Sequence, residues 1–399
     1  MNRSTRFAFS FVALLFSGAA LAQSQDVQTD SITPEGKPAA PVAFVYVQSA
    51  KHPSGGEINA FTAAANGELK TIAGSPFNYN DSPQGANGKY LFGMESNLST
   101  IDSFRIESNG AIEKVESLNT AQYDAGNCGN PGFFSLDRSG SKLYNVAFAP
   151  DCTIVSPEAV QSFSINSSDG KLDFLSDVGA NPGGGINISV TGNNKYAYMP
   201  TSQIETGNSF GFAAYKRESN GSMEYLGDQW LMPAGNIGPA PEEPQAEFYW
   251  PEISAADSTD HVAAVLHLYD QELDDFGDYV GVYTAGSNGE LSTTNTYQDM
   301  PGVAENPSWM GISPSNKYLA VAGSGLEVFH FNGANPVTKL KSLLSNVKIL
   351  QAGWDNNGHL YALSSSHLYV YTVTSTSVTE ASGSPYSIPS AESMMVQIK

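Results

Sequence analysis

SPSNKYLAVAG, residues 313–323, joins a polar turn to an alternating apolar strand, and this element decides the fold. Short apolar runs bounded by Ser, Asn and Gly are typical of β-strands. Clear copies occur as Gly88-Lys89-Tyr90-Leu91, Ser141-Lys142-Leu143-Tyr144, Asn194-Lys195-Tyr196-Ala197-Tyr198, Asn316-Lys317-Tyr318-Leu319 and Gly358-His359-Leu360-Tyr361. Residues 260–263 are a divergent copy and residues 44–47 are the strand without its turn, so the element occurs seven times. Such repetition predicts a repeat architecture.

A second element lies between these strands, at residues 66–69, 109–112, 169–172, 220–223 and 288–291. It contains Asn-Gly or Asp-Gly, the tight-turn signal of β-hairpins. A third element, Gly-Ser-Pro followed by an aromatic residue, occurs at 74–77 and 383–386. Each unit is therefore predicted to form four antiparallel strands, labelled a to d from the innermost to the outermost. The second unit leaves little room for its a-strand, between residues 77 and 89.

These repeats predict an all-β, seven-bladed β-propeller of four-stranded antiparallel blades over residues 43–399. A solenoid is the competing repeat architecture, but solenoids have separate caps at both ends. Here the repeats begin at a b-strand, at Phe44, and residues 394–398 have the alternation of an a-strand. We expect this C-terminal strand to join the N-terminal blade, which closes the ring and removes exposed sheet edges.

The N-terminal residues indicate export. Arg3 and Arg6 precede an apolar run over residues 7–16, and Ala20-Leu21-Ala22 follows it. This is the pattern of a signal peptide, residues 1–22, with cleavage after Ala22. A membrane anchor is the alternative, although the run is short for a bilayer. Residues 23–42 are polar and without periodicity, which indicates a flexible linker. We predict a secreted or periplasmic protein with no membrane span after cleavage.

The charge of the chain limits its partners. It has 19 Lys and Arg against 40 Asp and Glu, a net charge of −21. Nucleic acid binding requires clustered cations, so no nucleic acid partner is expected. Acidity on this scale favours solubility and attracts cations. The partner that we expect is a small molecule or another component of the envelope or extracellular space, bound by a monomer.

Several motifs resemble the lactonase-type seven-bladed propellers, a family that includes bacterial 6-phosphogluconolactonase and fungal carboxymuconate-cyclising enzymes. They are the strand at 44–47, the Asn-Gly-x-Leu turns, Gly-Ser-Pro-Phe at 74–77 and Ser-Pro-Ser-Asn-Lys-Tyr-Leu at 313–319. The resemblance implies a lactone surrounded by a His after Pro, an Arg-His pair, a Glu and a later Arg. The matching positions are Pro131-Gly132, Gly185-Ile186-Asn187, residues 198–201 and the strand end near His267. The His, the Arg-His pair and the later Arg are missing, so we expect the catalytic residues of lactonases to be absent.

Cys128 and Cys152 are the two cysteines of the chain. In an exported protein an isolated pair favours a disulfide. The expected hairpin of strands 131–136 and 142–148 turns at residues 137–140, and both cysteines are symmetric about position 140. Symmetric residues of an antiparallel hairpin lie opposite one another. We predict a disulfide that clamps two loops; two free thiols are the alternative.

The b-to-c and d-to-a loops of a propeller share one face, and here they are long and acidic, as at 268–278. Elaborated loops on a rigid scaffold are where ligand sites usually form. The ligand-face candidates are His267, Asp270, Glu272, Glu205 and Glu247. Calcium takes several carboxylate oxygens, so the candidate metal ligands are Asp270, Glu272, Asp274 and Asp278. A solvated acidic loop without an ion is the alternative, and no other cofactor is indicated.

Two main functions follow from these patterns. The first is an exported, lactonase-like propeller that serves as a binding or interaction module through its acidic loop face. The alternative is a lactonase or other carboxylic ester hydrolase with a different residue set, acting on a sugar-derived or other lactone with or without a metal ion. A structural role in the envelope is a third hypothesis.

Overall fold

Strands make up almost all regular structure of the computed structural model. It describes residues 40–50, 55–95, 100–123, 132–147, 159–179, 187–202, 210–229, 249–270 and 275–399. The helices among these residues are two 3₁₀ turns, η1 (Thr120–Tyr123) and η2 (Tyr297–Asp299). No helix in these ranges has the length and hydrophobicity needed to cross a membrane. The chain divides into residues 1–38 and 39–399, and the first unit lies outside the described residues.

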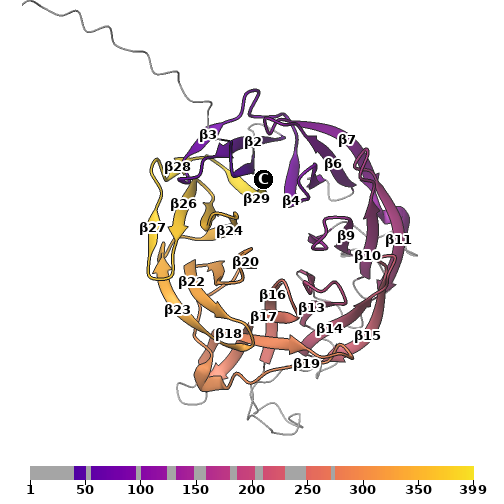
Figure 1. The fold of residues 1–399 in the computed structure, drawn as a ribbon, viewed down its shortest axis with the longest axis vertical. Helices are drawn as coiled ribbons and strands as arrows, with labels where there is room; N and C mark the ends of the chain where they lie inside the picture. Colours follow the sequence, from indigo (N-terminus) through magenta and orange to yellow (C-terminus); the bar gives the residue numbers. More distant parts are fainter. Residues whose placement is uncertain are drawn as a thin grey trace, which may run out of the picture. The chain divides into compact units, whose positions relative to one another are not determined.

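The strands form seven antiparallel sheets around one axis, which confirms the predicted propeller (Figure 1). In strand order a to d, blade one is β29 (Ala391–Ile398), β1 (Ala43–Ala50), β2 (Gly56–Ala63) and β3 (Leu69–Thr71). Blade two is β4 (Asp81–Ala86), β5 (Tyr90–Glu95), β6 (Thr100–Ile106) and β7 (Ile112–Asn119). Blade three is β8 (Phe134–Leu136), β9 (Lys142–Ala147), β10 (Ala159–Ile165) and β11 (Leu172–Gly179).

The remaining blades follow the same order. Blade four is β12 (Ser189–Val190), β13 (Tyr196–Ser202), β14 (Phe210–Arg217) and β15 (Met223–Gln229). Blade five is β16 (Tyr249–Ala256), β17 (His261–Asp270), β18 (Asp275–Ala285) and β19 (Leu291–Ser292). Blade six is β20 (Trp309–Ile312), β21 (Tyr318–Gly323), β22 (Gly325–Asn332) and β23 (Asn335–Leu343). Blade seven is β24 (Ile349–Trp354), β25 (His359–Ser364), β26 (His367–Val373) and β27 (Val378–Glu380), and β28 (Tyr386–Ser387) also pairs with β26.

The ring closes as the sequence predicts. β29 pairs with β1 in an antiparallel register that runs from Ala43 opposite Ile398 to Ser49 opposite Ala391. Blade two is complete as well, because β4 fits between residues 77 and 89 and pairs with β5. The short a-strand was hidden in the sequence by Pro83 and Gly85, which flank an irregularity in this pairing.

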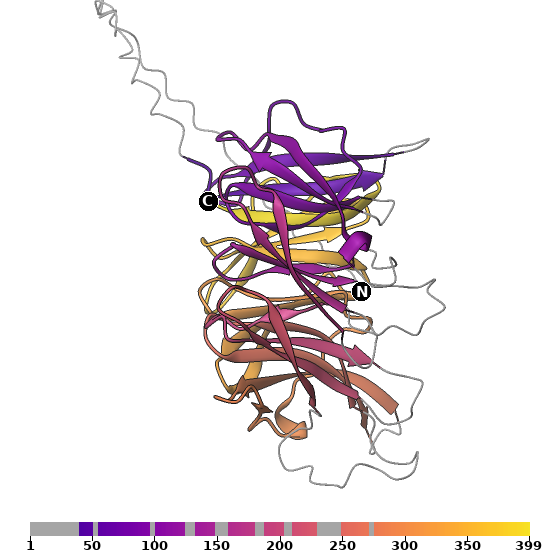
Figure 2. The ribbon, with the colours of Figure 1, turned by 90° about the vertical axis from the view of Figure 1, so that its right-hand side faces the viewer.

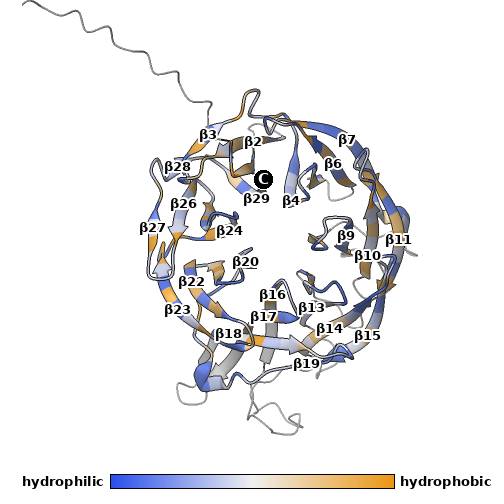
Figure 3. Cartoon of the chain, in the orientation of Figure 1, coloured by the Kyte–Doolittle hydropathy of each residue, from blue (hydrophilic) through white to orange (hydrophobic). Residues whose placement is uncertain are grey.

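The hydrophobic core lies between neighbouring blades. One cluster joins blades one and two through Phe44, Tyr46, Ile58, Leu91 and Phe104, all at most 2 % exposed. Figure 3 shows hydrophobic residues among the hydrophilic ones along the strands, and every residue of the b-strand β21 is buried, as expected where both faces of a blade pack on their neighbours. Burial of such side chains contributes roughly 1.5–3 kcal/mol each, so the blade interfaces supply most of the stability.

The Asn-Gly and Asp-Gly turns also link the blades. Each of three b-strand tyrosines donates its hydroxyl hydrogen to a glycine carbonyl of the next blade: Tyr46 to Gly110 (2.9 Å), Tyr144 to Gly221 (3.1 Å) and Tyr198 to Gly289 (2.8 Å). Gly110 shows why glycine is needed, since its φ is +89° and a Cβ would lie 2.6 Å from Cδ1 of Phe44. The turns read from the sequence therefore fix the order of the blades as well as the hairpins.

The Gly-Ser-Pro motifs have one structure in both blades. The Ser-Pro bonds at 75–76 and 384–385 are cis. Each Ser hydroxyl accepts a hydrogen bond from a c-strand N–H group, that of Ala60 in blade one (2.9 Å) and that of Val370 in blade seven (3.0 Å). The motif thus satisfies backbone donors of the c-strand beyond the short d-strand.

The ring has two faces. We call the side with the a–b and c–d turns the turn face, and the side with the b–c and d–a connections the loop face. Figure 2 shows the ring edge-on, with the end of β29 on the turn face at the left. Inner strands run from the loop face to the turn face, so their first residues mark the loop face.

Candidate functional site

The structure describes part of the predicted ligand face. Among the predicted residues it shows the side chains of His267 and Asp278, and only the backbone of Asp270, at the end of β17. The other candidates lie outside the described residues, namely Glu205, Glu247, Glu272, Asp274, Cys128 and Cys152. The acidic face as a whole, the calcium site and the disulfide therefore stay predictions.

The prediction of a long b–c loop at 268–278 is wrong. β17 continues to Asp270 and β18 begins at Asp275, and the register pairs these two residues. Tyr269 and Phe276 are also register partners. Tyr and Phe have a high β-propensity, and the run of acidic residues concealed this signal in the sequence.

The extended hairpin brings His267 and Asp278 together. They are register partners, and Nδ1 of His267 lies 2.6 Å from Oδ1 of Asp278. The Asp278 side chain is 8 % exposed and that of His267 is 24 % exposed. A carboxylate on Nδ1 fixes the orientation of the imidazole ring. The pair therefore places an oriented imidazole near the loop face.

The same contact bears on the predicted metal site. Asp278 was a candidate ligand, and one of its oxygens is engaged by His267. In the parts of the chain that the structure describes, no group of three or more His, Cys, Asp or Glu residues could hold a metal ion. The other three candidate ligands are not tested, so a cation at this hairpin would have to share Asp278 with His267.

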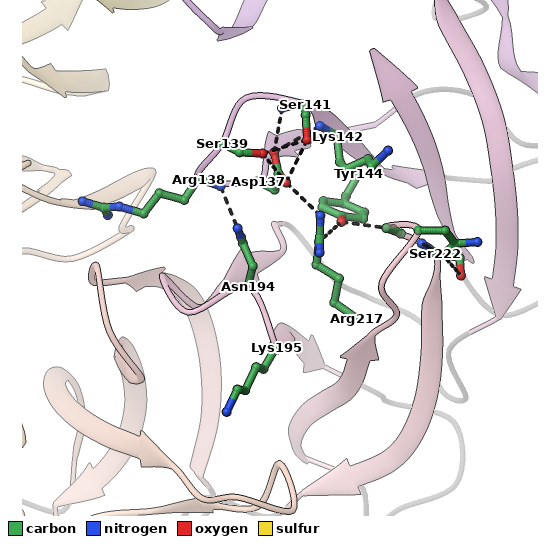
Figure 4. A network of polar contacts seen from close by, with 12 residues as sticks. Asp137, Arg138, Ser139, Ser141, Lys142, Tyr144, Asn194, Lys195, Arg217 and Ser222 are labelled. Atoms are coloured by element: carbon green, nitrogen blue, oxygen red, sulfur yellow. Dashed lines mark hydrogen bonds and ion pairs between the residues drawn. The ribbon is translucent and has the colours of Figure 1, made fainter. Parts of the chain in front are cut away.

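The three arginines of residues 23–399 lie on the turn face, and two of them are paired with acidic side chains. Arg105 contacts Glu107 at 3.1 Å and also pairs with Glu113. Arg217 is 12 % exposed, donates to the Tyr144 hydroxyl at 2.8 Å and pairs with Asp137 at 2.9 Å (Figure 4). Arg138 is exposed in the turn after β8. Residues 23–399 contain no further arginine for an anionic ligand on the loop face.

Asn187 and Gly132 belong to the positions that the family resemblance matches to the lactone site, and the structure describes both. Asn187 is used by the fold, since its Nδ2 donates to the Ser254 carbonyl at 2.8 Å and its Oδ1 accepts from the Ser254 N–H at 3.3 Å. Gly132 is followed by Phe133, which is 55 % exposed at the loop-face end of blade three. An exposed aromatic ring at the start of an inner strand is a typical ligand contact, and no motif in the sequence marks Phe133 as one.

The hairpin behind the disulfide prediction has nearly the expected register. Phe134 pairs with Asn145 and Leu136 with Leu143, so the hairpin is centred between Ser139 and Gly140. The prediction placed this centre at position 140. The strands end at Ala147 in β9, before the second cysteine. The described register therefore stops short of both cysteines, and the disulfide stays a prediction.

Blade two contains a buried charged cluster that sequence reasoning missed. The Asp81 and Asp102 side chains are 1 % and 0 % exposed, and Lys114 pairs with both, at 3.6 Å from Asp81. Burial, followed by the neighbouring Asp102, raises the pKa of Asp81 to about 7. No motif marks these residues, because they come from three separate strands. Both carboxylates are buried, whereas Lys114 is 31 % exposed, and Asp81 is the first residue of the inner strand β4, at its loop-face end.

Structural comparison shows the same fold in known proteins. Two similar structures are named as candidate 6-phosphogluconolactonases. The one from Bacteroides uniformis has a TM-score of 0.62 and 12 % sequence identity, and the match covers 90 % of this chain and 100 % of that one. The one from Bacteroides fragilis has a TM-score of 0.57 and 12 % identity, and the match covers 89 % of this chain and 97 % of that one. The periplasmic gluconolactonase of Pseudomonas aeruginosa is also similar, with a TM-score of 0.50 and 14 % identity over 76 % of this chain and 83 % of that one. No family model and no curated protein matches the sequence. The chain thus has a lactonase-like propeller fold.

Proposed function

We propose that the protein is an exported binding module that takes a small ligand without anionic groups on its loop face. The observation that carries this proposal is the position of the arginines, which lie on the turn face. Phosphorylated and carboxylated lactones are anions, and their recognition depends on charge-assisted hydrogen bonds, most often from arginine. The acidity predicted for the loop face disfavours such ligands further.

Phe133 gives this proposal a contact residue. It is 55 % exposed, and one other large apolar side chain in the described ranges is comparably exposed, Leu226 at 41 %. Ligand sites combine apolar or aromatic surface with a few polar groups. We expect Phe133 to supply the apolar surface and the His267–Asp278 pair to be available for polar contacts elsewhere on the same face.

Ligand-observed NMR with uncharged sugars, amino sugars and uncharged lactones tests the binding role. We expect saturation transfer to at least one of these classes and none to 6-phosphogluconolactone. F133A should remove the signal, whereas L226A, which removes an exposed apolar side chain on the outer strand β15, should leave it unchanged. Binding of the phosphorylated lactone in preference to its uncharged counterpart would overturn the proposal.

A second candidate function is hydrolysis, and the 2.6 Å contact between His267 and Asp278 favours it. An aspartate that orients a histidine gives that histidine the properties of a general base. Hydrolysis of uncharged γ- and δ-lactones, followed with and without EDTA, distinguishes the two functions. Turnover that H267Q and D278N reduce by about 100-fold or more would establish the enzyme. H261Q is the matched control, because His261 makes a similar contact with Asp257 (2.9 Å) on the turn face.

A further inference from the structure

The a–b turns of the ring form a continuous inner rim on the turn face. We define the rim by residues 87–89, 137–141, 191–195, 257–260, 313–317 and 355–358. Successive turns are hydrogen-bonded to each other: Asn87 Nδ2 donates to Gly140 O (2.9 Å), Arg138 N to Asn194 Oδ1 (3.4 Å), Asn193 N to Thr259 O (3.0 Å) and Ser258 N to Asn316 Oδ1 (3.3 Å). These bonds hold blades two to six at fixed spacing along the rim.

Neighbouring turns also lie in direct contact, and two of their glycines have no space for a side chain. A Cβ on Gly140, whose φ is +65°, would lie 2.7 Å from Cβ of Asn87. A Cβ on Gly192 would lie 2.0 Å from the Ser258 carbonyl carbon. Side chains on the rim are therefore carried by a rigid base, and little conformational entropy of the backbone is lost when a partner binds.

Cations dominate the exposed charge of this rim. Lys89, Arg138, Lys195 and Lys317 are exposed, and within the described part of the chain none of them has an acidic partner. Lys89, Arg138 and Lys195 belong to three consecutive turns. Figure 4 shows the side chains of Arg138 and Lys195 extending to the same side, away from Arg217. The single exposed acid among the rim turns is Asp260, which contacts His261 at 3.8 Å.

The remaining acids of the rim are buried and hydrogen-bonded. Asp137 pairs with Arg217 and accepts hydrogen bonds from Ser139 and Ser141 (Figure 4). Asp257 contacts His261 at 2.9 Å, and Asp355 contacts His359 at 2.7 Å. These carboxylates are thus not exposed to a partner, whereas four cations are, on a chain whose net charge is −21.

We infer that the inner rim binds a short acidic peptide segment of a partner protein. The rim supplies four preorganised cations and hydrogen-bonding Asn and Ser side chains. The outer c–d turns limit the length of the partner, because they present the exposed acids Glu68 and Glu290. A long polyanion that ran beyond the rim would meet these carboxylates, whereas a few glutamates or aspartates confined to the rim would not.

Fluorescence anisotropy with labelled hexaglutamate and the full chain tests this inference. At about 20 mM salt, where the Debye length is about 20 Å, we expect binding that weakens as salt is added. The variant K89Q/R138Q/K195Q/K317Q should bind at least about tenfold more weakly. The variant K70Q/K171Q/K341Q/K348Q removes four exposed lysines outside the rim and should change the affinity less than about threefold.

The outcomes separate the rim from a general charge effect. Equal losses in the two variants, or no binding of hexaglutamate to the wild type, would overturn the inference. Tighter binding of heparin than of hexaglutamate per negative charge would also overturn it, since it would favour a long polysaccharide over a short peptide. Circular dichroism of both variants checks that the fold is retained, which we expect because all eight side chains are exposed or at the rim surface.

Discussion

Blades two and six contain the same charged unit in two different environments. Asp102 and Glu327 each lie two residues before a phenylalanine on the c-strand, Phe104 or Phe329. The d-strand lysine opposite that phenylalanine, Lys114 or Lys339, pairs with the acid. Each ammonium group also lies over the ring, at 5.4 Å from Phe104 and 5.8 Å from Phe329, which is cation–π distance.

The blades differ in a second carboxylate. Blade two buries Asp81 beside this unit, whereas extending the β20–β21 register by one residue places Ser308 at the corresponding position of blade six. Gly93 makes room for Asp81, since a Cβ there would lie 2.9 Å from Cβ of Asp81. Blade six has Val321 opposite Glu327, where blade two has Gly93 opposite Asp102.

The difference shows how one added group changes a unit of the fold. In blade six one cation balances one carboxylate that is 11 % exposed, and Ser342 donates a further hydrogen bond. In blade two one cation faces two carboxylates that are at most 1 % exposed, and Glu95 adds to the negative field at Asp81. A bound proton is the simplest way to neutralise the second carboxylate, because isolated buried charge is costly.

The largest expected effect is a pH dependence that D81N abolishes. The pKa of Asp81 is raised from 3.8 to about 7, so the folded state binds this proton more tightly than the unfolded state. The stability that the proton supplies is complete below pH 4 and is lost as the pH rises through 7. A shift of this size corresponds to at most about 4 kcal/mol. We expect urea unfolding at pH 4 to 8 to show this loss relative to D81N.

The groups around Asp81 define the control for that measurement. Asp102, Lys114 and Glu95 act on its carboxylate, and the neighbouring strands β2 and β29 carry Glu57 and Glu392. E327Q removes the acid of blade six and should leave the difference between pH 4 and pH 8 unchanged. A wild-type slope equal to that of D81N would show that the pair does not share a proton.

The second-largest loss of stability is expected when Lys114 is replaced. K114M leaves two buried carboxylates without a cation, and breaking a buried ion pair costs about 3 kcal/mol. The loss should be greater at pH 8 than at pH 5, because protonation relieves it. Chemical denaturation at both values measures the effect. Rescue of K114M by D81N at pH 8 would support the shared proton, and an additive double mutant would contradict it.

A third change should transfer the behaviour of blade two to blade six. V321G/S308D introduces the second carboxylate and the space for it, and V321G alone is the reference. A buried carboxylate beside Glu327 is expected to cost about 2 kcal/mol at pH 8 and much less at pH 5. Equal stabilities of the double and single variants at both pH values would mean that the strand register alone does not create the site.

The smallest effect is expected for the lysine of blade six. Lys339 is 42 % exposed and its acid is close to the surface. Exposed ion pairs contribute about 1 kcal/mol or less. K339M should therefore lower the free energy of unfolding by no more than this, independent of pH between 5 and 8. A loss equal to that of K114M would remove the distinction between the two blades.

The sequence predicted the fold because turns carry local signals. The glycine of an Asn-Gly or Asp-Gly turn adopts a positive φ where the hairpin requires it, and Gly110 and Gly289 both do so. The closing strand at 391–398 could also be predicted, since alternation at the C-terminus matched a missing inner strand. The a-strand of blade two could not, because Pro83 and Gly85 break its periodicity.

The candidate site was predicted only in part, for a physical reason. His267 and Asp278 were both named, but their contact depends on how far β17 and β18 extend, and acidic residues at 270–275 suggested a loop. Asp81, Asp102 and Lys114 meet across three strands, which no spacing in the sequence records. Tertiary pairing, unlike turn formation, is not a property of neighbouring residues.

The pairing of β29 with β1 has a consequence for the order of folding during synthesis. β1 is the first strand of the ring to be made, and its inner partner β29 is made more than 340 residues later, since Ser49 pairs with Ala391. Contacts between such distant residues form slowly, because the ends of a long loop must meet. The first blade to leave the ribosome is thus the last to be completed, and until then its inner edge can pair with other strands.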